Sequence, residues 1–237
     1  MSAARPIRPL DAAGLVLIRE RGRGPEVLVG RRHSRVPFLP DIYVFPGGRV
    51  DSADSAASGF PEPLHRAVET DLSAGSRRPG ATFARTAIRE TFEETGLLFG
   101  AEGSRAPASP SAPIWQAFAG DGRAPAFGAL DFICRAITPT YSKRRYNTRF
   151  FLADGDLAHG ELGGSGELLD LGWRSLDELR TLGLVDVTQF VMREALRRWT
   201  AGLKPGCEPS RLFCYKGEIA RCRNGPGSAW AVPEEGF

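Results

Sequence analysis

The stretch Ala84-Arg-Thr-Ala-Ile-Arg-Glu-Thr-Phe-Glu-Glu-Thr-Gly96 decides how this chain is interpreted. On a helix, at about 100° per residue, Glu93 and Glu94 fall within about 60° of Glu90. Ile88 and Phe92 fall on the opposite face and predict a stripe that packs on the core. A glycine such as Gly96 commonly ends a helix. The pattern therefore predicts a helix over 82–98 with one acidic face.

Three carboxylates on one helix face need an explanation. Like charges at these spacings destabilise a helix by about 0.2–0.5 kcal/mol per pair. The stretch holds no lysine that would neutralise them. Several carboxylates together with water are the ligands that Mg²⁺ and Mn²⁺ prefer. From the glutamates alone, two interpretations stay open: a cradle for a divalent cation, or a solvated acidic face in which Arg89 pairs with Glu93.

A turn, Phe45-Pro-Gly-Gly48, precedes this helix, and its glycines allow the backbone to approach a ligand or a neighbouring helix closely. Together the two segments resemble the signature of the Nudix hydrolases, R-E-U-x-E-E-x-G-U preceded by F-P-G-G. These enzymes cleave nucleoside diphosphates linked to another moiety. The resemblance implies an α+β or α/β protein, a Nudix-type α/β/α sandwich with a mixed central sheet. It also implies a hydrolase that acts on phosphorus-containing acid anhydrides, a pyrophosphatase.

The complete family box reads G-x5-E-x7-R-E-U-x-E-E-x-G-U, and this chain departs from it. Counting from Gly48, the position of the first glutamate holds Asp54. Between Asp54 and Arg89 lie 34 residues where the box has seven, so an insertion of 27 residues, about 55–81, splits it. A split box resembles the branch of coenzyme A diphosphatase-like Nudix proteins, and so do the flanking segments 31–48 and 138–151. We expect the insertion to shape the substrate entrance, and a mobile surface excursion is the alternative.

The resemblance assigns roles to individual residues. As ligands of Mg²⁺ or Mn²⁺ it implies Glu90, Glu93, Glu94 and the backbone of Gly48. As catalytic residues it implies Glu90, Glu93 and Arg89, with Arg89 orienting a carboxylate and Glu90 or a loop carboxylate as general base. Glu167, next to an expected strand, is the candidate for that loop carboxylate, although a plain exposed loop acid is the alternative.

Arginines can bind phosphate oxygens with their forked guanidinium groups. The substrate-binding candidates are Arg31, Arg32, Gly47, Gly48, Arg144 and Arg145. For the basic runs, a solvated loop is the alternative interpretation. Tyr141, Tyr146 and Trp173 are candidates for stacking on an adenine, or else they are core and loop anchors.

Alternating and apolar runs predict the remaining elements. Strands are expected at 13–18, 26–30, 42–45, 130–137, 148–153, 168–173 and 211–216. Further helices are expected near 64–72, 114–118, 175–182 and 187–199. We expect one Nudix domain over 10–203 and a C-terminal extension over 204–237.

Charge, apolar runs and cysteine spacing bear on nucleic-acid binding, membrane insertion and cysteine-bound metal. The 237 residues carry 31 basic and 28 acidic side chains, and the net charge of +3 without a clustered motif does not predict nucleic-acid binding. No apolar run approaches the length of about 18 residues that a membrane span needs. The four cysteines lack metal-site spacing, which favours free thiols in a reducing, cytoplasmic compartment.

The predicted function is hydrolysis of the diphosphate of coenzyme A, acyl-coenzyme A or a related nucleotide conjugate by a monomer or homodimer. Two alternatives stay open. One is a pyrophosphatase for ADP-ribose, NADH or dinucleoside polyphosphates. The other is a ligand sensor with a Nudix fold and no catalysis.

Overall fold

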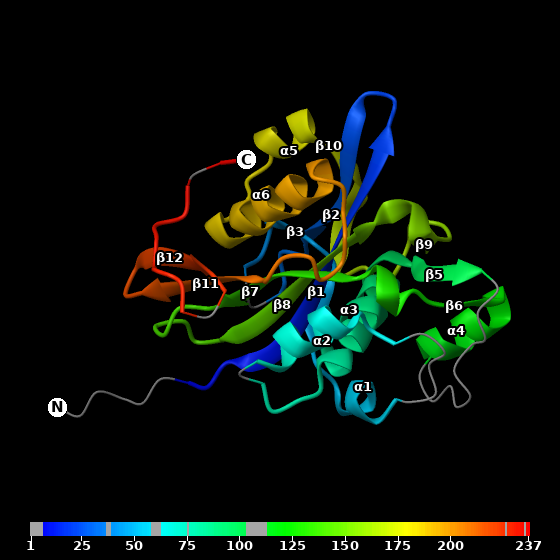
Figure 1. Ribbon diagram of the computed structural model, residues 1–237. Coiled ribbons are helices and arrows are strands. Elements are labelled where there is room, and N and C mark those ends of the chain that lie inside the picture. Colours follow the sequence, from blue (N-terminus) through cyan, green and yellow to red (C-terminus); the bar gives the residue numbers. More distant parts are fainter. Residues whose placement is uncertain are drawn as a thin grey trace.

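A mixed β-sheet forms the middle layer of the protein (Figure 1). The computed structural model describes residues 7–36, 39–57, 63–74, 76–102, 113–225, 227–234 and 236–237. The sheet has the strand order β10-β2-β1-β8-β7-β11-β12, with β3 beside β2 and β4 beside β1. Its strands are β1 (Leu10–Arg21), β2 (Gly24–Arg32), β3 (Tyr43–Val44), β4 (Gly47–Arg49), β7 (Asp131–Ile137), β8 (Tyr146–Asp154), β10 (Leu168–Ser175), β11 (Arg211–Lys216) and β12 (Ile219–Asn224). The β1–β8 and β11–β7 pairs are parallel, and the other pairs are antiparallel.

Helices cover both faces of this sheet (Figure 1). On one face lie α1 (Ser52–Ala56), α2 (Arg66–Ser73), α3 (Gly80–Thr95) and α4 (Pro113–Asp121), and on the other lie α5 (Leu176–Thr181) and α6 (Asp186–Thr200). A small sheet of β5 (Leu98–Glu102), β6 (Arg123–Pro125) and β9 (Ala158–His159) flanks α3 and α4, and the 3₁₀ turns are η1 (Phe127–Ala129) and η2 (Gly155–Leu157). The expected α/β/α sandwich with a mixed central sheet is therefore confirmed.

The alternation of side chains along β1 explains the two cores. Leu15 and Leu17 are buried in the core beneath α3, whereas Val16 and Ile18 are buried in the core beneath α6. Successive side chains of a strand point to opposite faces, so one apolar strand supplies both layers. A continuous apolar run is what a strand needs when helices cover both of its faces.

The described part of the insertion contributes to the core. Its helix α2 buries Val68 and Leu72 in the core beside α3. Residues 58–62 and 75 of the insertion lie outside the described residues. None of its described residues lines the large cavity discussed below, so the expected role at the entrance is not met by this part of the chain.

Residues 204–237 contribute to the central sheet. The expected strand at 211–216 is β11, which pairs in parallel with β7 and carries β12 at the sheet edge. Ala231 then forms a bridge with Cys222 of β12. All four cysteines are free thiols. Across the described ranges of the chain, no helix has the length and apolar character required to cross a membrane.

Candidate active site

The glycine turn and the acidic helix meet directly. Gly47 and Gly48 lie in β4, opposite Gly14 and Ala13 of β1. A methyl group on Gly47 would lie 2.5 Å from the Cα of Gly14, and one on Gly48 would lie 2.5 Å from the carboxylate of Glu90. No side chain fits between these groups. Glycine is therefore required at both positions for the turn to contact α3.

This contact positions the last glutamate of the helix. The amide of Gly47 donates a hydrogen bond of 2.8 Å to Oε2 of Glu94, whose residue is only 4% exposed. Gly96 ends α3 in the left-handed conformation, with φ at 78°. The amides of Gly163 and Ser165 then donate to the carbonyls of Thr95 and Glu93. The terminal carbonyls of α3 are thus satisfied by a loop that leads to Glu167.

Arg89 joins the two halves of the split box. Its Nε and Nη2 donate to the two carboxylate oxygens of Asp54 at 2.8 and 2.9 Å. Asp54 is buried, accepts the Thr86 hydroxyl at 2.8 Å, and accepts the Asp51 amide at 2.9 Å in the capping box of α1. A bidentate guanidinium–carboxylate pair fixes orientation as well as charge. Asp54 therefore positions Arg89 across 34 intervening residues.

Arg89 also holds the acidic face in place. Its Nη1 lies 2.9 Å from Oε1 of Glu90 and 2.8 Å from Oε2 of Glu93. Glu93 is the most accessible of the three glutamates, with a side chain 46% exposed. Arg89 therefore contacts two of the three glutamates.

Burial penalises two of the three negative charges. Burial raises the pKa of Glu90 from 4.5 to about 7, although Arg89 opposes this rise. Burial also raises the pKa of Glu94 to about 8, against the hydrogen bond from Gly47, and the charges of Glu90 and Glu167 add to the rise. The surroundings of these two carboxylates therefore disfavour their charged forms.

A cavity of about 670 Å³ opens beside this cluster. Seven of the predicted site residues line it: Arg32, Gly47, Gly48, Glu90, Glu93, Glu94 and Glu167. The rest of its wall is largely apolar and aromatic and includes Val44, Phe45, Phe150, Tyr141, Tyr146, Phe213 and Tyr215. The cavity therefore has one acidic end and one aromatic wall.

Residues 8–198 match the model of the NUDIX domain family. The chain belongs to the Nudix domain family. It resembles a NUDIX hydrolase from Alicyclobacillus acidocaldarius, with a TM-score of 0.59 and 30% identity over 80% of this chain and 92% of that one.

Two curated relatives of this Nudix protein carry the name acyl-coenzyme A diphosphatase NUDT19. The one from Gallus gallus is 37% identical over 111 residues, which is 37% of this chain and 29% of that protein. The one from Xenopus laevis is 31% identical over 96 residues, which is 31% of this chain and 25% of that protein. The chain thus matches less than a third of the length of either relative.

The Nudix glutamates fit a hard divalent cation by their chemistry. Carboxylate oxygens and a backbone carbonyl are suitable donors. Burial disfavours the charged forms of Glu90 and Glu94, and a cation would offset that cost. Within the described ranges, no group of three or more acidic, histidine or cysteine side chains has the arrangement of a metal site. Arg89 contacts Glu90 and Glu93, and Gly47 contacts Glu94.

Three predicted substrate-binding residues lie outside the cavity wall. Arg31 pairs with Asp41 at 2.8 Å. Arg145 donates to the carbonyls of Thr138 and Ile7 at 3.1 and 2.7 Å, and Arg144 is exposed without lining the cavity. Spacing along the sequence could not show that these side chains point away from the Nudix site.

Of the three aromatic candidates, two line the cavity and one does not. Tyr141 and Tyr146 line the cavity. Trp173 instead packs beneath the guanidinium of Arg19, 4.1 Å from the ring centroid, and against the core. Trp173 is therefore an anchor rather than a cavity residue.

Sequence reasoning missed the far wall of the cavity, which β11 and the start of α6 supply. The hydroxyl of Tyr215 bonds both carboxylate oxygens of Asp186, at 2.8 and 2.7 Å. Tyr215 lies beyond the family match, which ends at residue 198. The signal for it was the apolar strand at 211–216, whose parallel pairing with β7 brings Phe213 and Tyr215 to the site.

Proposed function

We propose that this Nudix protein is a metal-dependent diphosphohydrolase of nucleotide conjugates. The observation that carries the proposal is the position of Glu90, Glu93 and Glu94 on one face of α3, beside a 670 Å³ cavity and against the glycine turn. Carboxylates on a rigid helix, supported by second contacts, suit a site that must hold its ligands in place.

Each residue then has a role. Glu90, Glu93, Glu94 and the Gly48 carbonyl would hold Mg²⁺ or Mn²⁺, which supplies charge neutralisation of the diphosphate and a more acidic water. Arg89, fixed by Asp54, keeps Glu90 and Glu93 in place. The exposed Glu167 borders the same cavity and is suited to accept a proton from the attacking water. Arg32 at the rim would attract the substrate phosphates.

Coenzyme A or acyl-coenzyme A is the substrate class we favour. The names of the two curated relatives support it, over the 111 and 96 residues that they share with this chain. The aromatic wall with Tyr141, Tyr146 and Phe213 supports a ligand with a base or an apolar chain. The free thiols support a reducing, cytoplasmic location. We expect the protein to act as a monomer or homodimer.

A substrate screen tests this proposal. Purified protein with Mg²⁺ or Mn²⁺ would be incubated with coenzyme A, acyl-coenzyme A, ADP-ribose, NADH and dinucleoside polyphosphates, and products would be separated chromatographically. We expect adenosine 3′,5′-bisphosphate and a phosphopantetheine-type product from coenzyme A. Turnover of ADP-ribose, NADH or dinucleoside polyphosphates without turnover of coenzyme A would support the diphosphohydrolase activity. It would contradict coenzyme A as the substrate.

A ligand sensor without catalysis is the second candidate. The metal-binding half of the family box argues against it, since it is complete in Arg89, Glu90, Glu93 and Glu94. Binding a ligand without catalysis does not require buried glutamates whose charged forms are disfavoured. Saturable binding of one of these nucleotides without turnover at any metal concentration would favour the sensor.

A further inference from the structure

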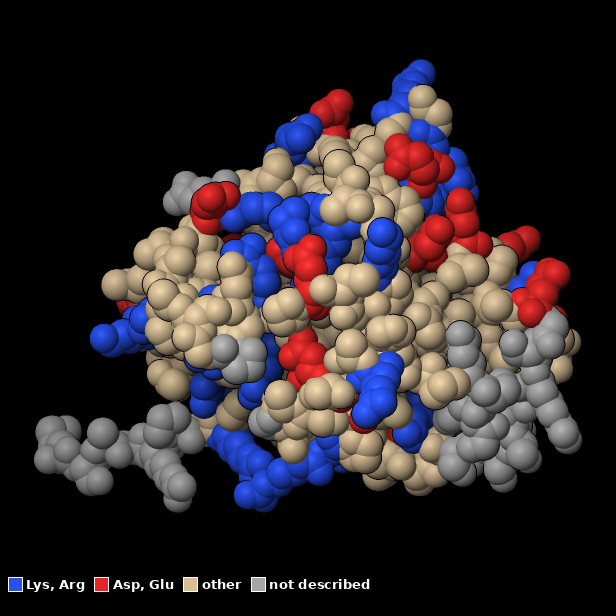
Figure 2. Space-filling model, in the orientation of Figure 1, with Lys and Arg blue, Asp and Glu red and all other residues tan. Residues whose placement is uncertain are grey.

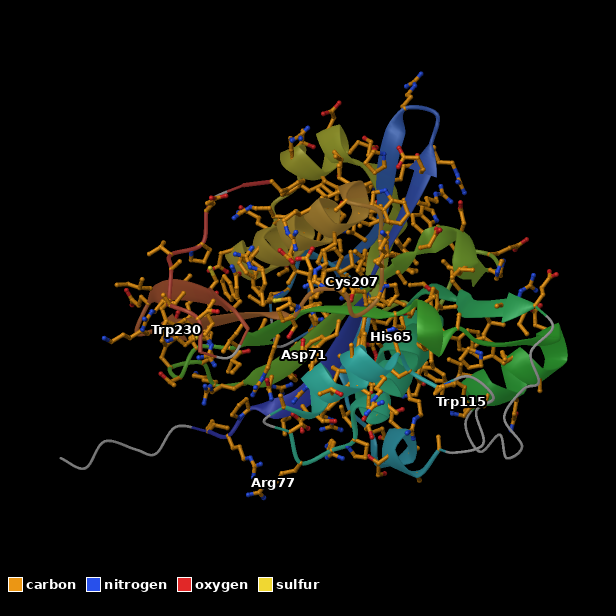
Figure 3. The ribbon with its side chains drawn as sticks, viewed as in Figure 1. His65, Asp71, Arg77, Trp115, Cys207 and Trp230 are labelled. Atoms are coloured by element: carbon orange, nitrogen blue, oxygen red, sulfur yellow. The ribbon has the colours of Figure 1, made fainter. Side chains whose placement is uncertain are left out.

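A second cavity, of about 260 Å³, lies between α2 and the strands β7, β8, β11 and β12. Arg135, Arg149 and Arg223 border it together with Asp71 of α2. Figure 3 labels Asp71 on α2 and Trp230 beside the β11–β12 hairpin. In the same orientation, Figure 2 shows Lys and Arg side chains gathered at the lower left of the molecule. We call this space the arginine cavity.

The arginine cavity and the Nudix site lie on opposite faces of the same strands. In β7 and β8, Arg135 and Arg149 face the arginine cavity, while the adjacent Ala136 and Thr148 line the active-site cavity. In β11 the neighbouring residues Leu212 and Phe213 divide in the same way. The alternation of a strand therefore separates the two cavities by the thickness of the sheet.

Two of the three arginines have no acidic partner among the described residues. The Nε of Arg135 donates to Oδ1 of Asn147 at 2.7 Å, which is a neutral acceptor. The guanidinium of Arg223 lies 5.0 Å from the ring centroid of Trp230, and its Nε is buried without a hydrogen-bond partner. Arg149 is 1% exposed and is paired with Asp11 at 3.0 Å.

These arginines are also close enough to repel one another. Arg135 and Arg149 stand directly opposite each other in the β7–β8 register, a position where like charges are destabilising. Burial lowers the pKa of Arg149 to about 10 against the charge of Asp11, and the charge of Arg135 adds to the lowering. Burial lowers the pKa of Arg135 as well, against the charge of Asp11, and the charge of Arg223 adds to the lowering. The cavity wall therefore holds more positive charge than it compensates.

Two acidic side chains, Asp11 and Asp71, lie nearby. Asp11 divides its charge between Arg149 and Arg78. Asp71 accepts the backbone amide of Ser210 with Oδ2 at 2.6 Å. A fourth arginine at the rim, Arg211, directs Nη1 to Glu194 on the other side of the sheet. The two arginines without acidic partners outnumber Asp71, so the described wall of this cavity favours a small anion.

We propose that the arginine cavity binds the phosphate dianion of inorganic phosphate or of a small phosphomonoester. Arg135 and Arg223 supply the uncommitted donors, and the buried Arg149 supplies fixed positive charge. Guanidinium groups match phosphate oxygens in charge and geometry. Leu72, Phe132 and Leu212 leave an apolar surface for the organic part of an ester. The proposal does not depend on the reaction at the Nudix site.

Calorimetric titration of the full-length protein with inorganic phosphate, and separately with glycerol phosphate, tests the site. EDTA and constant ionic strength exclude metal-linked binding at the glutamates. We expect saturable binding with a 1:1 ratio, weakened at least tenfold by Arg135→Met and by Arg223→Met. Arg66→Met removes the same charge from the exposed face of α2, outside the cavity, and should change the affinity less than twofold. Tighter binding of glycerol phosphate than of phosphate would identify an ester as the ligand, and the reverse would identify the free ion.

Thermal unfolding in chloride buffer shows whether each variant folds. We expect Arg135→Met and Arg223→Met to unfold at or above the wild-type temperature, because each relieves repulsion. If Arg135→Met does not fold, the edge-strand variant Arg223→Met alone carries the test. Equal phosphate affinity of wild type and Arg223→Met would overturn the proposal, as would the absence of binding or a dimer interface that covers this cavity.

Discussion

Replacement of Glu94 by Gln should separate stability from activity in this protein. Glu94 is 4% exposed and accepts the amide of Gly47, and its pKa is raised by burial from 4.5 to about 8. The amide of Gln keeps an oxygen for Gly47 and carries no charge. The variant therefore removes the buried charge while the hydrogen bond and the volume stay nearly the same.

The sign of the effect follows from the raised pKa. The folded state binds the Glu94 proton more tightly than the unfolded state, so the free energy of unfolding falls as pH rises from about 4.5 to about 8. Fully counted, this cost is roughly 4 kcal/mol at pH 8 and below about 1 kcal/mol at pH 5. Water in the adjoining cavity and relaxation of Glu90 reduce it, so we expect Glu94→Gln to gain about 1–3 kcal/mol at pH 8.

Thermal unfolding in EDTA at pH 5, 6, 7 and 8 measures this gain. For a chain of this size, it corresponds to a rise in Tm of roughly 2–10 °C at pH 8. The matched control is Glu93→Gln, because the Glu93 side chain is 46% exposed and its removal relieves no buried charge. A lower Tm of Glu94→Gln at pH 8, or a gain that does not grow with pH, would refute the reasoning.

Three further predictions concern the supports of the site. Gly48→Ala places a methyl group 2.5 Å from the carboxylate of Glu90 and should lower kcat at least tenfold. The control Gly120→Ala adds a methyl group in open space and should leave kcat unchanged. Equal kcat values of the two variants would show that activity does not require this close contact. Asp54→Ala leaves buried Arg89 without its bidentate partner and should cost about 3–5 kcal/mol in urea unfolding, with Asp54→Asn losing less. A cost below about 1 kcal/mol for Asp54→Ala would contradict its role as the anchor of Arg89. Leu72→Ala should cost about 2–5 kcal/mol because α2 is part of the core, and an unchanged stability would mean that the insertion is dispensable.

The acidic helix and the glycine turn were predictable from the sequence because local spacing determines both. Helical periodicity places Glu90, Glu93 and Glu94 on one face whatever the tertiary fold. The prediction of a helix to residue 98 was too long, since Gly96 ends α3 and Leu98 begins β5. Leu98 and Phe99 fit a strand as well as a helix, and only the pairing with β9 decides between them.

The rest of the site depends on contacts between distant segments. The partnership of Asp54 and Arg89 spans the insertion, and the family pattern alone left the role of the shorter aspartate open. Tyr215 reaches the cavity only because β11 adds to the sheet beside β7. Arg31 and Arg145 carry the expected charge, but Asp41 and two backbone carbonyls engage it elsewhere. Side-chain direction, which a motif does not encode, accounts for these differences.

The most direct test of the central claim compares wild type with Glu93→Gln in Mg²⁺-dependent turnover of the best substrate from the screen. Glu93 is exposed at the cavity and its replacement relieves no buried charge, so the variant should fold with a Tm within about 2 °C of wild type. We predict that its turnover falls at least a hundredfold, because the cation loses a carboxylate ligand. Wild-type turnover in a folded Glu93→Gln variant would show that the acidic face of α3 is not the metal cradle.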